Sequence, residues 1–231
     1  MKIGYRIALV LTSVHTLAGC AVPPYYTAEN LDARVIDAET KQPISDAVVV
    51  ALWVLKGGME SSPIASLKVE EATTDEMGRF HIPGWGPLAR PSNGYLDVLD
   101  PELVILKHGY LLLRASNYNE AIPVHTLVDK AVRTSNWNGR DIGLERDKGD
   151  QTRYANAFYS AFGPLSGFVF NSDDCKWKQM PRTVHAFEAE RIYQGEVMHK
   201  TLYQIPPLSG LLKRPQCQPT EEFLRVYHGI R

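Results

Sequence analysis

The side chains that could perform chemistry are few and scattered along this sequence. None of its seven histidines forms a His-x-x-x-His or His-Glu-x-x-His helix motif of the kind that binds zinc. His185 and Glu188 lie three residues apart and could share a helical face, where a surface pair is favoured over a metal site. Asp173 and Asp174 lack the further spaced oxygen ligands of a calcium loop. We therefore expect no metal and no cofactor.

The sequence motifs that mark catalytic nucleophiles and phosphate-binding loops are also missing. In Gly163–Gly167 the serine falls one place late for a Gly-x-Ser-x-Gly turn. No glycine-rich loop followed by Lys-Ser or Lys-Thr occurs that could cradle phosphates. We therefore predict no catalytic residues and a protein that is not an enzyme. Because enzymes can assemble a site from scattered residues, a periplasmic hydrolase acting on envelope polymers stays an alternative.

The first twenty residues have the order of a secretory signal. Lys2 and Arg6 precede an apolar run from residue 7 to 14, which is shorter than the roughly 20 residues of a membrane-spanning helix. Leu17-Ala18-Gly19-Cys20 follows, and it resembles the lipobox of bacterial lipoproteins. The resemblance implies that residues 1–19 are removed and that Cys20 is acylated. An ordinary signal peptide with an incidental cysteine and an uncleaved anchor are the alternatives.

The same resemblance implies a location. Lipid on Cys20 would hold the chain on a membrane, with residues 20–30 as a short tether in which Pro23 and Pro24 prevent a helix. Ala21, rather than aspartate, follows the cysteine. By analogy with enterobacterial sorting, this favours the periplasmic face of the outer membrane over the inner membrane.

Composition and charge limit the class of partner. The chain has 231 residues, of which 44% are hydrophobic, as suits a folded body with a core. Its net charge of −1 becomes about −3 if Lys2 and Arg6 leave with the signal. No basic run occurs, so nucleic acid is not an expected partner.

Two cysteines remain beside the lipid site. In an exported protein, Cys175 and Cys217 are candidates for a disulfide bond. Two separate buried thiols are the alternative.

Strand patterns dominate residues 31–147. Alternating or β-branched runs separated by turn residues predict an antiparallel β-sandwich. The run from residue 44 to 55 is almost continuously apolar, which indicates a strand covered on both faces. The expected strands are 33–37, 44–55, 64–74, 79–83, 95–99, 103–107, 111–113 and a closing strand within 138–144, with a loop at 84–94.

The order of these segments resembles a known family. The segments that carry the resemblance are Val35–Asp37, Thr40–Pro43, Ile44–Val50, Thr73–Phe80 and Lys107–Tyr110. They are similar to the carboxypeptidase regulatory-like domain, a transthyretin-like sandwich. The excursion from residue 115 to 137 departs from that pattern. The resemblance implies a module for folding, adhesion or partner binding that carries no catalytic residues.

Residues 148–231 change to helical periodicity and predict a helical extension packed on the sandwich. Tyr154, Phe158, Phe162 and Leu165 share one helical face, with Asp150 as the N-cap and an end at Gly163-Pro164. A second helix is expected from 181 to 204.

Together these features predict a lipid-anchored, non-catalytic binding or assembly module of the envelope. We expect its partner to be another envelope protein. Weak candidates for binding are Trp85, Tyr118 and Trp137, although either tryptophan could cap the core instead. A purely structural envelope lipoprotein is a further alternative.

Overall fold

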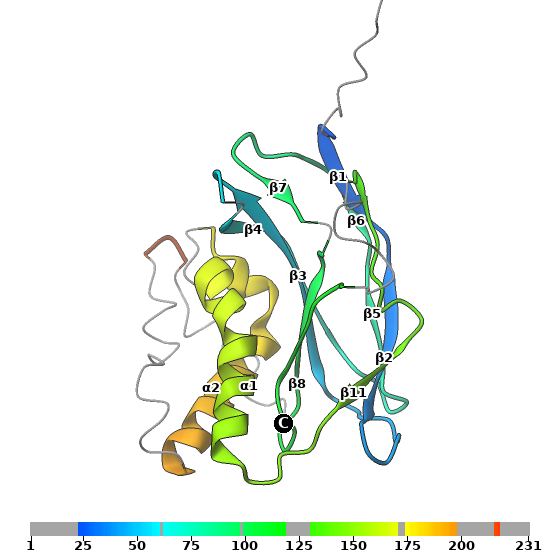
Figure 1. Ribbon diagram of the computed structural model, residues 1–231, viewed down its shortest axis with the longest axis vertical. Helices are drawn as coiled ribbons and strands as arrows, with labels where there is room; N and C mark the ends of the chain where they lie inside the picture. Colours follow the sequence, from blue (N-terminus) through cyan, green and yellow to red (C-terminus); the bar gives the residue numbers. More distant parts are fainter. Residues whose placement is uncertain are drawn as a thin grey trace, which may run out of the picture.

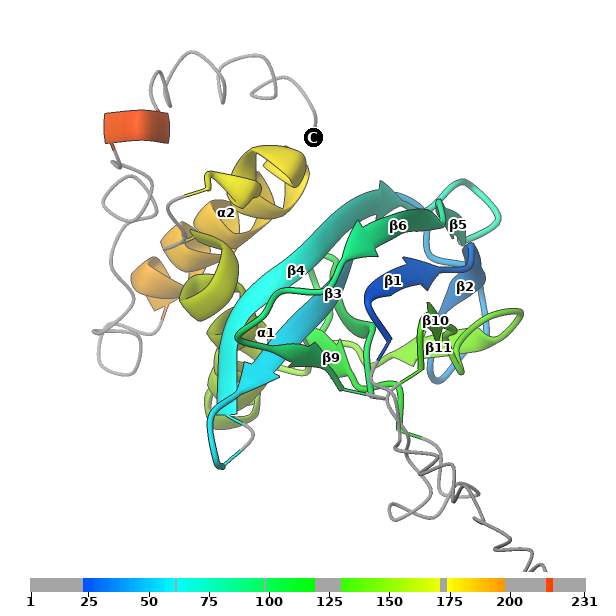
Figure 2. The ribbon, with the colours of Figure 1, turned by 90° about the horizontal axis from the view of Figure 1, so that it is seen from above.

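A central sheet lies between a second β-layer and a pair of helices. The computed structural model describes residues 23–60, 62–97, 99–118, 130–170, 174–197 and 215–217. Figure 1 shows the helices on one side of strands β3, β4 and β8, with β1, β2, β5 and β6 on the other side. The view from above in Figure 2 shows the same separation. The predicted mainly β sandwich with a helical segment is therefore confirmed.

The strands form three hydrogen-bonded groups, ordered β4-β3-β8-β9, β11-β2-β5 and β10-β1-β6, and β7 pairs with β3. Their bounds are β1 Tyr25–Ala28, β2 Leu31–Asp37, β3 Val48–Gly57, β4 Ser62–Thr73, β5 Arg79–Ile82, β6 Trp85–Ala89, β7 Tyr95–Leu96, β8 Glu102–Leu106, β9 Leu113–Ala115, β10 Val132–Arg133 and β11 Asp141–Leu144.

Strand β3 is buried on both faces, as its apolar run predicts. Val50 and Leu52 belong to the core between the central sheet and the helices. Val49, Ala51 and Trp53 belong to the core between the two β-layers. Because successive side chains of a strand point to opposite faces, one continuous apolar segment serves both cores.

The second β-layer closes through a strand distant in sequence. β11 pairs with β2 in parallel, and β5 pairs with β2 in antiparallel orientation. Arg34 on β2 binds Asp141 on β11, with Nη2 2.6 Å from Oδ2. The closing strand expected within 138–144 is thus present, as β11.

Two segments differ from the expectation. The tether of residues 20–30 contains β1, and the loop of residues 84–94 contains β6. These two strands pair with each other, Tyr25 opposite Ala89 and Tyr26 opposite Leu88. Tyr26 is fully buried, so core packing and mutual pairing order segments whose prolines and glycines suggest loops.

Helix α1 (Gln151–Leu165) begins as expected and ends later. The Asp150 side chain accepts a hydrogen bond from the backbone N–H of Arg153 at 3.0 Å, which confirms the N-cap. The predicted end at Gly163-Pro164 is wrong, because the helix passes through the buried Pro164 and continues as the π-helix η2 (Ser166–Phe170). A π-helical turn adjusts the hydrogen-bond ladder around the missing proline N–H.

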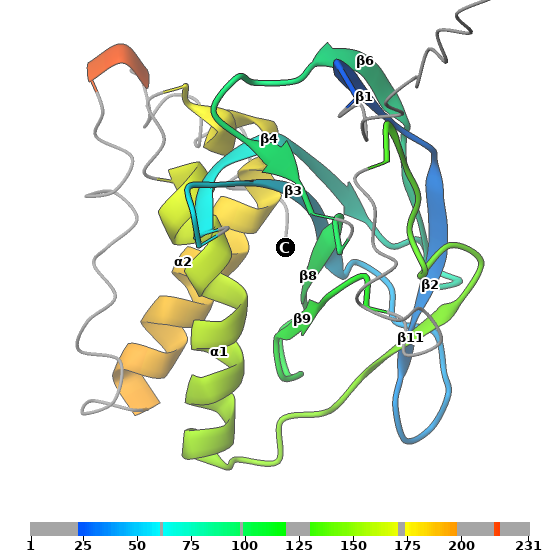
Figure 3. The ribbon, with the colours of Figure 1, turned by 45° about the horizontal axis from the view of Figure 1, so that its top comes forward.

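Helix α2 (Pro181–Val197) lies beside α1, as Figure 3 shows. The predicted extension to residue 204 lies outside the described residues. The 3-10 turns η3 (Lys176–Gln179) and η4 (Pro215–Cys217) complete this layer. Among the described helices, none has both the length and the apolarity to span a bilayer.

Aromatic rings fill the space between the helices. Phe158 packs its ring against Phe162 and Phe187 at centroid distances of 5.7 and 5.5 Å. Phe170 joins the same cluster, 5.8 Å from Phe162. The aromatic face predicted for the first helix therefore packs the core, as its periodicity indicates.

Candidate functional site

A pocket of about 480 Å³ opens where the central sheet meets the second half of α1. Strand β3 contributes Val54 and Lys56, and α1 contributes Tyr159 and Gly163. Asp97 and Asp100 lie in the segment before β8, Glu102 is the first residue of β8, and Arg114 comes from β9. Charged side chains are thus concentrated in this pocket, whereas the aromatic core fills other space between the central sheet and the helices.

Asp100 is the most perturbed acid of this pocket. Its residue is only 5% exposed, and its Oδ1 accepts a hydrogen bond from the backbone N–H of Val54 at 3.2 Å. Its Oδ2 is buried and has no hydrogen-bond partner among the described residues. Burial raises the pKa of Asp100 to about 8. The negative charges of Asp97 and Glu102 raise this pKa further, whereas the hydrogen bond from Val54 N–H and the positive charge of Arg133 lower it. Asp100 is therefore a carboxylic acid that keeps its proton at neutral pH.

The two neighbouring acids are paired with cations. Glu102 accepts a hydrogen bond through Oε1 from Nε of Arg114 at 2.6 Å. Asp97 forms an ion pair with Lys56 through Oδ2, and its Oδ1 accepts from the backbone N–H of Leu99 at 3.1 Å. The site thus places one buried acid beside two carboxylates that form ion pairs.

Buried polar groups hold this arrangement in place. Asn117 donates through Nδ2 to the backbone oxygens of Asp100 (3.2 Å) and Thr134 (2.9 Å). Arg133 is 3% exposed and donates to the backbone oxygen of Asp97. These bonds fasten the segment that carries the acids to the residues around β10 and restrict the positions of the carboxyl groups.

The combination is suited to acid–base chemistry. When environment separates the acidities of neighbouring carboxyl groups, one can donate a proton while another accepts one. Within the part of the chain that the structure describes, no three histidine, cysteine or acidic residues are grouped as metal ligands.

The binding candidates predicted from sequence are not part of this pocket. Trp85 packs edge-on against Trp53, with the two ring centroids 5.3 Å apart, and contacts the core between the β-layers. Trp137 packs on the same core and donates through Nε1 to the backbone oxygen of Ser116 at 3.0 Å. Tyr118 is 50% exposed. The two tryptophans therefore cap the core, which was the alternative interpretation.

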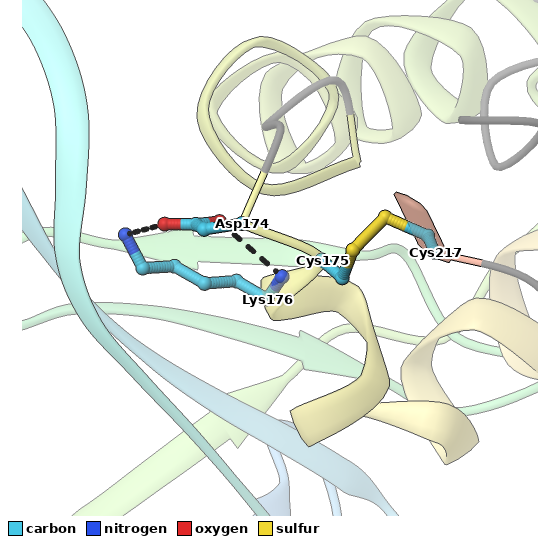
Figure 4. The surroundings of a disulfide bond; sticks show 4 residues. All are labelled: Asp174, Cys175, Lys176 and Cys217. Carbon is cyan, nitrogen blue, oxygen red and sulfur yellow. Dashed lines mark hydrogen bonds and ion pairs between the residues drawn. A yellow bond between two sulfur atoms is a disulfide. The ribbon is translucent and has the colours of Figure 1, made fainter. Parts of the chain in front are cut away.

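The predicted disulfide bond is present between Cys175 and Cys217 (Figure 4). Cys217 is completely buried and belongs to the same core cluster as Phe158 and Phe187 of the helices. Beside the bond, Lys176 pairs with Asp174 at 2.6 Å and donates to the backbone oxygen of Ser66 in β4. The bond thus fastens η4 to a loop that is itself tied to the central sheet. Cys20 lies outside the described residues.

A second polar cluster links the helices to the turn before β9. His108 contacts Glu190 of α2, with Nδ1 2.8 Å from Oε1. Tyr154 of α1 donates to the other oxygen of Glu190 at 2.5 Å. Glu190 is 6% exposed, so these bonds satisfy a buried carboxyl group between three elements.

Sequence reasoning missed the pocket acids altogether. Asp97, Asp100 and Glu102 lie within six residues, just before an apolar strand. That density of carboxyl groups beside a buried strand is a signal that could have been followed. Their cationic partners, Lys56 and Arg114, come from other strands and carry no local signal.

Comparison with known proteins identifies no family. No protein-family model and no curated protein matches this sequence. The 3-chlorocatechol 1,2-dioxygenase of Rhodococcus opacus 1CP matches with 17% identity and a TM-score of 0.31, over 52% of this chain and 60% of that one. The dioxygenase domain of a dioxygenase carbohydrate-binding protein fusion from Streptomyces sp. SirexAA-E matches with 15% identity and a TM-score of 0.30, over 55% and 82%. This chain thus spans three fifths of the length of the first of these structures.

This comparison corrects two expectations. The comparison does not support the prediction of a non-catalytic module that is not an enzyme, since the first five solved structures that it finds are all dioxygenases. TM-scores near 0.3 carry no activity or substrate over to this chain. The resemblance to the carboxypeptidase regulatory-like domain stays a prediction.

Proposed function

We propose that this protein is an envelope enzyme that performs hydrolysis in the pocket between the central sheet and α1. The observation that carries the proposal is the buried position of Asp100, which raises its pKa to about 8, beside the carboxylate of Glu102 that is paired with Arg114. One group can act as general acid and the other as general base at the same pH.

The proposed reaction needs only a water molecule and a substrate. Glu102 takes a proton from the water as its oxygen attacks, and Asp100 gives its proton to the oxygen of the leaving group as the bond breaks. Asp100 then regains a proton and Glu102 releases one, so the enzyme is unchanged. Glu102 is chosen as the base because Arg114 binds its Oε1, whereas both oxygens of Asp97 accept hydrogen bonds.

The charge of the pocket supports a neutral linkage as substrate. Lys56 and Arg114 balance Asp97 and Glu102, and protonated Asp100 adds no charge. Glycosidic bonds are neutral, and two carboxyl groups with different acidities are the usual means of hydrolysing them. The proposed substrate class is therefore a polysaccharide of the cell envelope.

The proposed location rests on the N-terminal residues. The lipobox-like Leu17-Ala18-Gly19-Cys20 supports acylation of Cys20 and attachment to the periplasmic face of the outer membrane. Replacing Cys20 by alanine should then move the protein from the membrane to the supernatant after cell fractionation. Equal membrane association of both forms would remove this part of the proposal.

Activity is tested with the purified full chain on isolated envelope polysaccharides, by measuring the release of reducing ends. Asp100→Asn and Glu102→Gln should each abolish release, while Glu76→Gln, which changes an exposed acid in the turn before β5, should not. Because Asp100 must be protonated, the rate should fall as the pH rises through about 8. Absence of release by the wild type, or equal release by Asp100→Asn, would refute the proposal.

A further inference from the structure

The distance between the proposed lipid site and the first strand is short. Cys20 precedes Pro23 by three residues and Tyr25 by five. An extended chain spans at most about 3.6 Å per residue, so the Cα atom of Tyr25 lies within about 18 Å of that of Cys20. If Cys20 is acylated, as proposed above, the start of β1 must lie close to the bilayer surface.

Strand β1 has one face that points into the core and one face that points outward. Tyr26 and Ala28 of β1 point into the core. Tyr25, the residue before Tyr26, points the other way and is 50% exposed.

The outward face continues onto the two neighbouring strands. Tyr25 pairs with the exposed Ala89 of β6, and Thr27 pairs with Val132 of β10, which is 49% exposed. Paired residues share a face of a sheet. We call Tyr25, Thr27, Ala89 and Val132 the β1 outer face.

Figure 1 shows where strand β1 begins in the molecule. In Figure 1 the start of β1 is at the top, and the tip of the β3–β4 hairpin lies toward the same end. The C-terminal end of α2 lies at the bottom. Met59, fully exposed at the hairpin tip, adds a further apolar side chain to the upper end.

We propose that the β1 outer face rests on the head-group region of the bilayer that holds the Cys20 lipid. Tyrosine prefers this interface because its ring is apolar and its hydroxyl is polar. The short connection to Cys20 leaves little freedom to turn this face away from the membrane.

The test uses lipidated full-length protein in vesicles of phosphatidylethanolamine and phosphatidylglycerol. With Cys20 acylated and Cys175 bonded to Cys217, a new cysteine is the only free thiol. Val132→Cys and Ile192→Cys are matched, because the native side chains are 49% and 50% exposed. Ala89→Cys provides a second position on the β1 outer face. Each variant is labelled with a fluorophore and mixed with phospholipids that carry a nitroxide quencher on the head group.

The quencher should extinguish fluorescence at positions 132 and 89 and leave it unchanged at position 192. Equal fluorescence at all three positions in vesicle-bound protein would overturn the inference while leaving the lipid anchor intact. Flotation of the vesicles reports the anchor separately. Protein that does not float with them would refute acylation of Cys20 and this inference with it.

Discussion

Replacement of Asp100 by asparagine should remove most of the pH dependence that this residue imposes on stability. In the fold its pKa is raised to about 8, from an ordinary value of 3.8, chiefly because it is buried. Between these two values the folded protein holds a proton that the unfolded chain has released. The free energy of unfolding therefore falls as the pH rises through this window.

The size of the effect follows from the two pKa values. Each unit of difference corresponds to about 1.4 kcal/mol, and between pH 5 and pH 8 the wild type should lose roughly 3–4 kcal/mol through Asp100. Asparagine resembles the protonated acid in shape and stays neutral, and its side-chain oxygen can still accept from the N–H of Val54. The loss should therefore be absent from Asp100→Asn.

The assay is urea unfolding of both proteins at several pH values from 5 to 8, with Glu76→Gln as a control for the removal of an exposed acid. The stability difference between wild type and Asp100→Asn should grow in favour of the variant as the pH rises. Parallel curves for the two proteins would show that Asp100 ionises normally in the fold. That result would remove the basis for its role as a general acid.

Two further predictions concern the helical layer. The Cys175–Cys217 bond closes a loop with a sequence separation of 42 residues, so replacing both cysteines by alanine should lower the free energy of unfolding by about 4 kcal/mol. Denaturant unfolding checks this, and equal stability of the two forms would contradict it. Glu71 of β4 caps α2, accepting from the backbone N–H of Thr183 at 2.6 Å, and Glu71→Ala should cost about 1–3 kcal/mol. Slower hydrogen exchange, or no change, in the first turn of α2 would show that this cap is unimportant.

Local pattern predicted the elements whose signal lies within a few residues. The apolar run of β3 indicated a strand with two buried faces, and Asp150 marked the start of α1. Local pattern failed at Pro164, where the packing of the following turn allows the chain to continue as helix beyond a proline. It also failed at β1 and β6, which pair with each other across more than fifty residues.

The sequence by itself indicated the layered β architecture and made Cys175 and Cys217 candidates for a disulfide bond, because apolar periodicity and the number of cysteines can be read along the chain. Only the structure showed that the two cysteines are bonded. Only the tertiary structure decided that Asp100 holds its proton and that Glu102 and Asp97 lie beside it with cationic partners. Acidity depends on burial and on charges brought from other strands and from around β10. These surroundings exist only after the chain has folded.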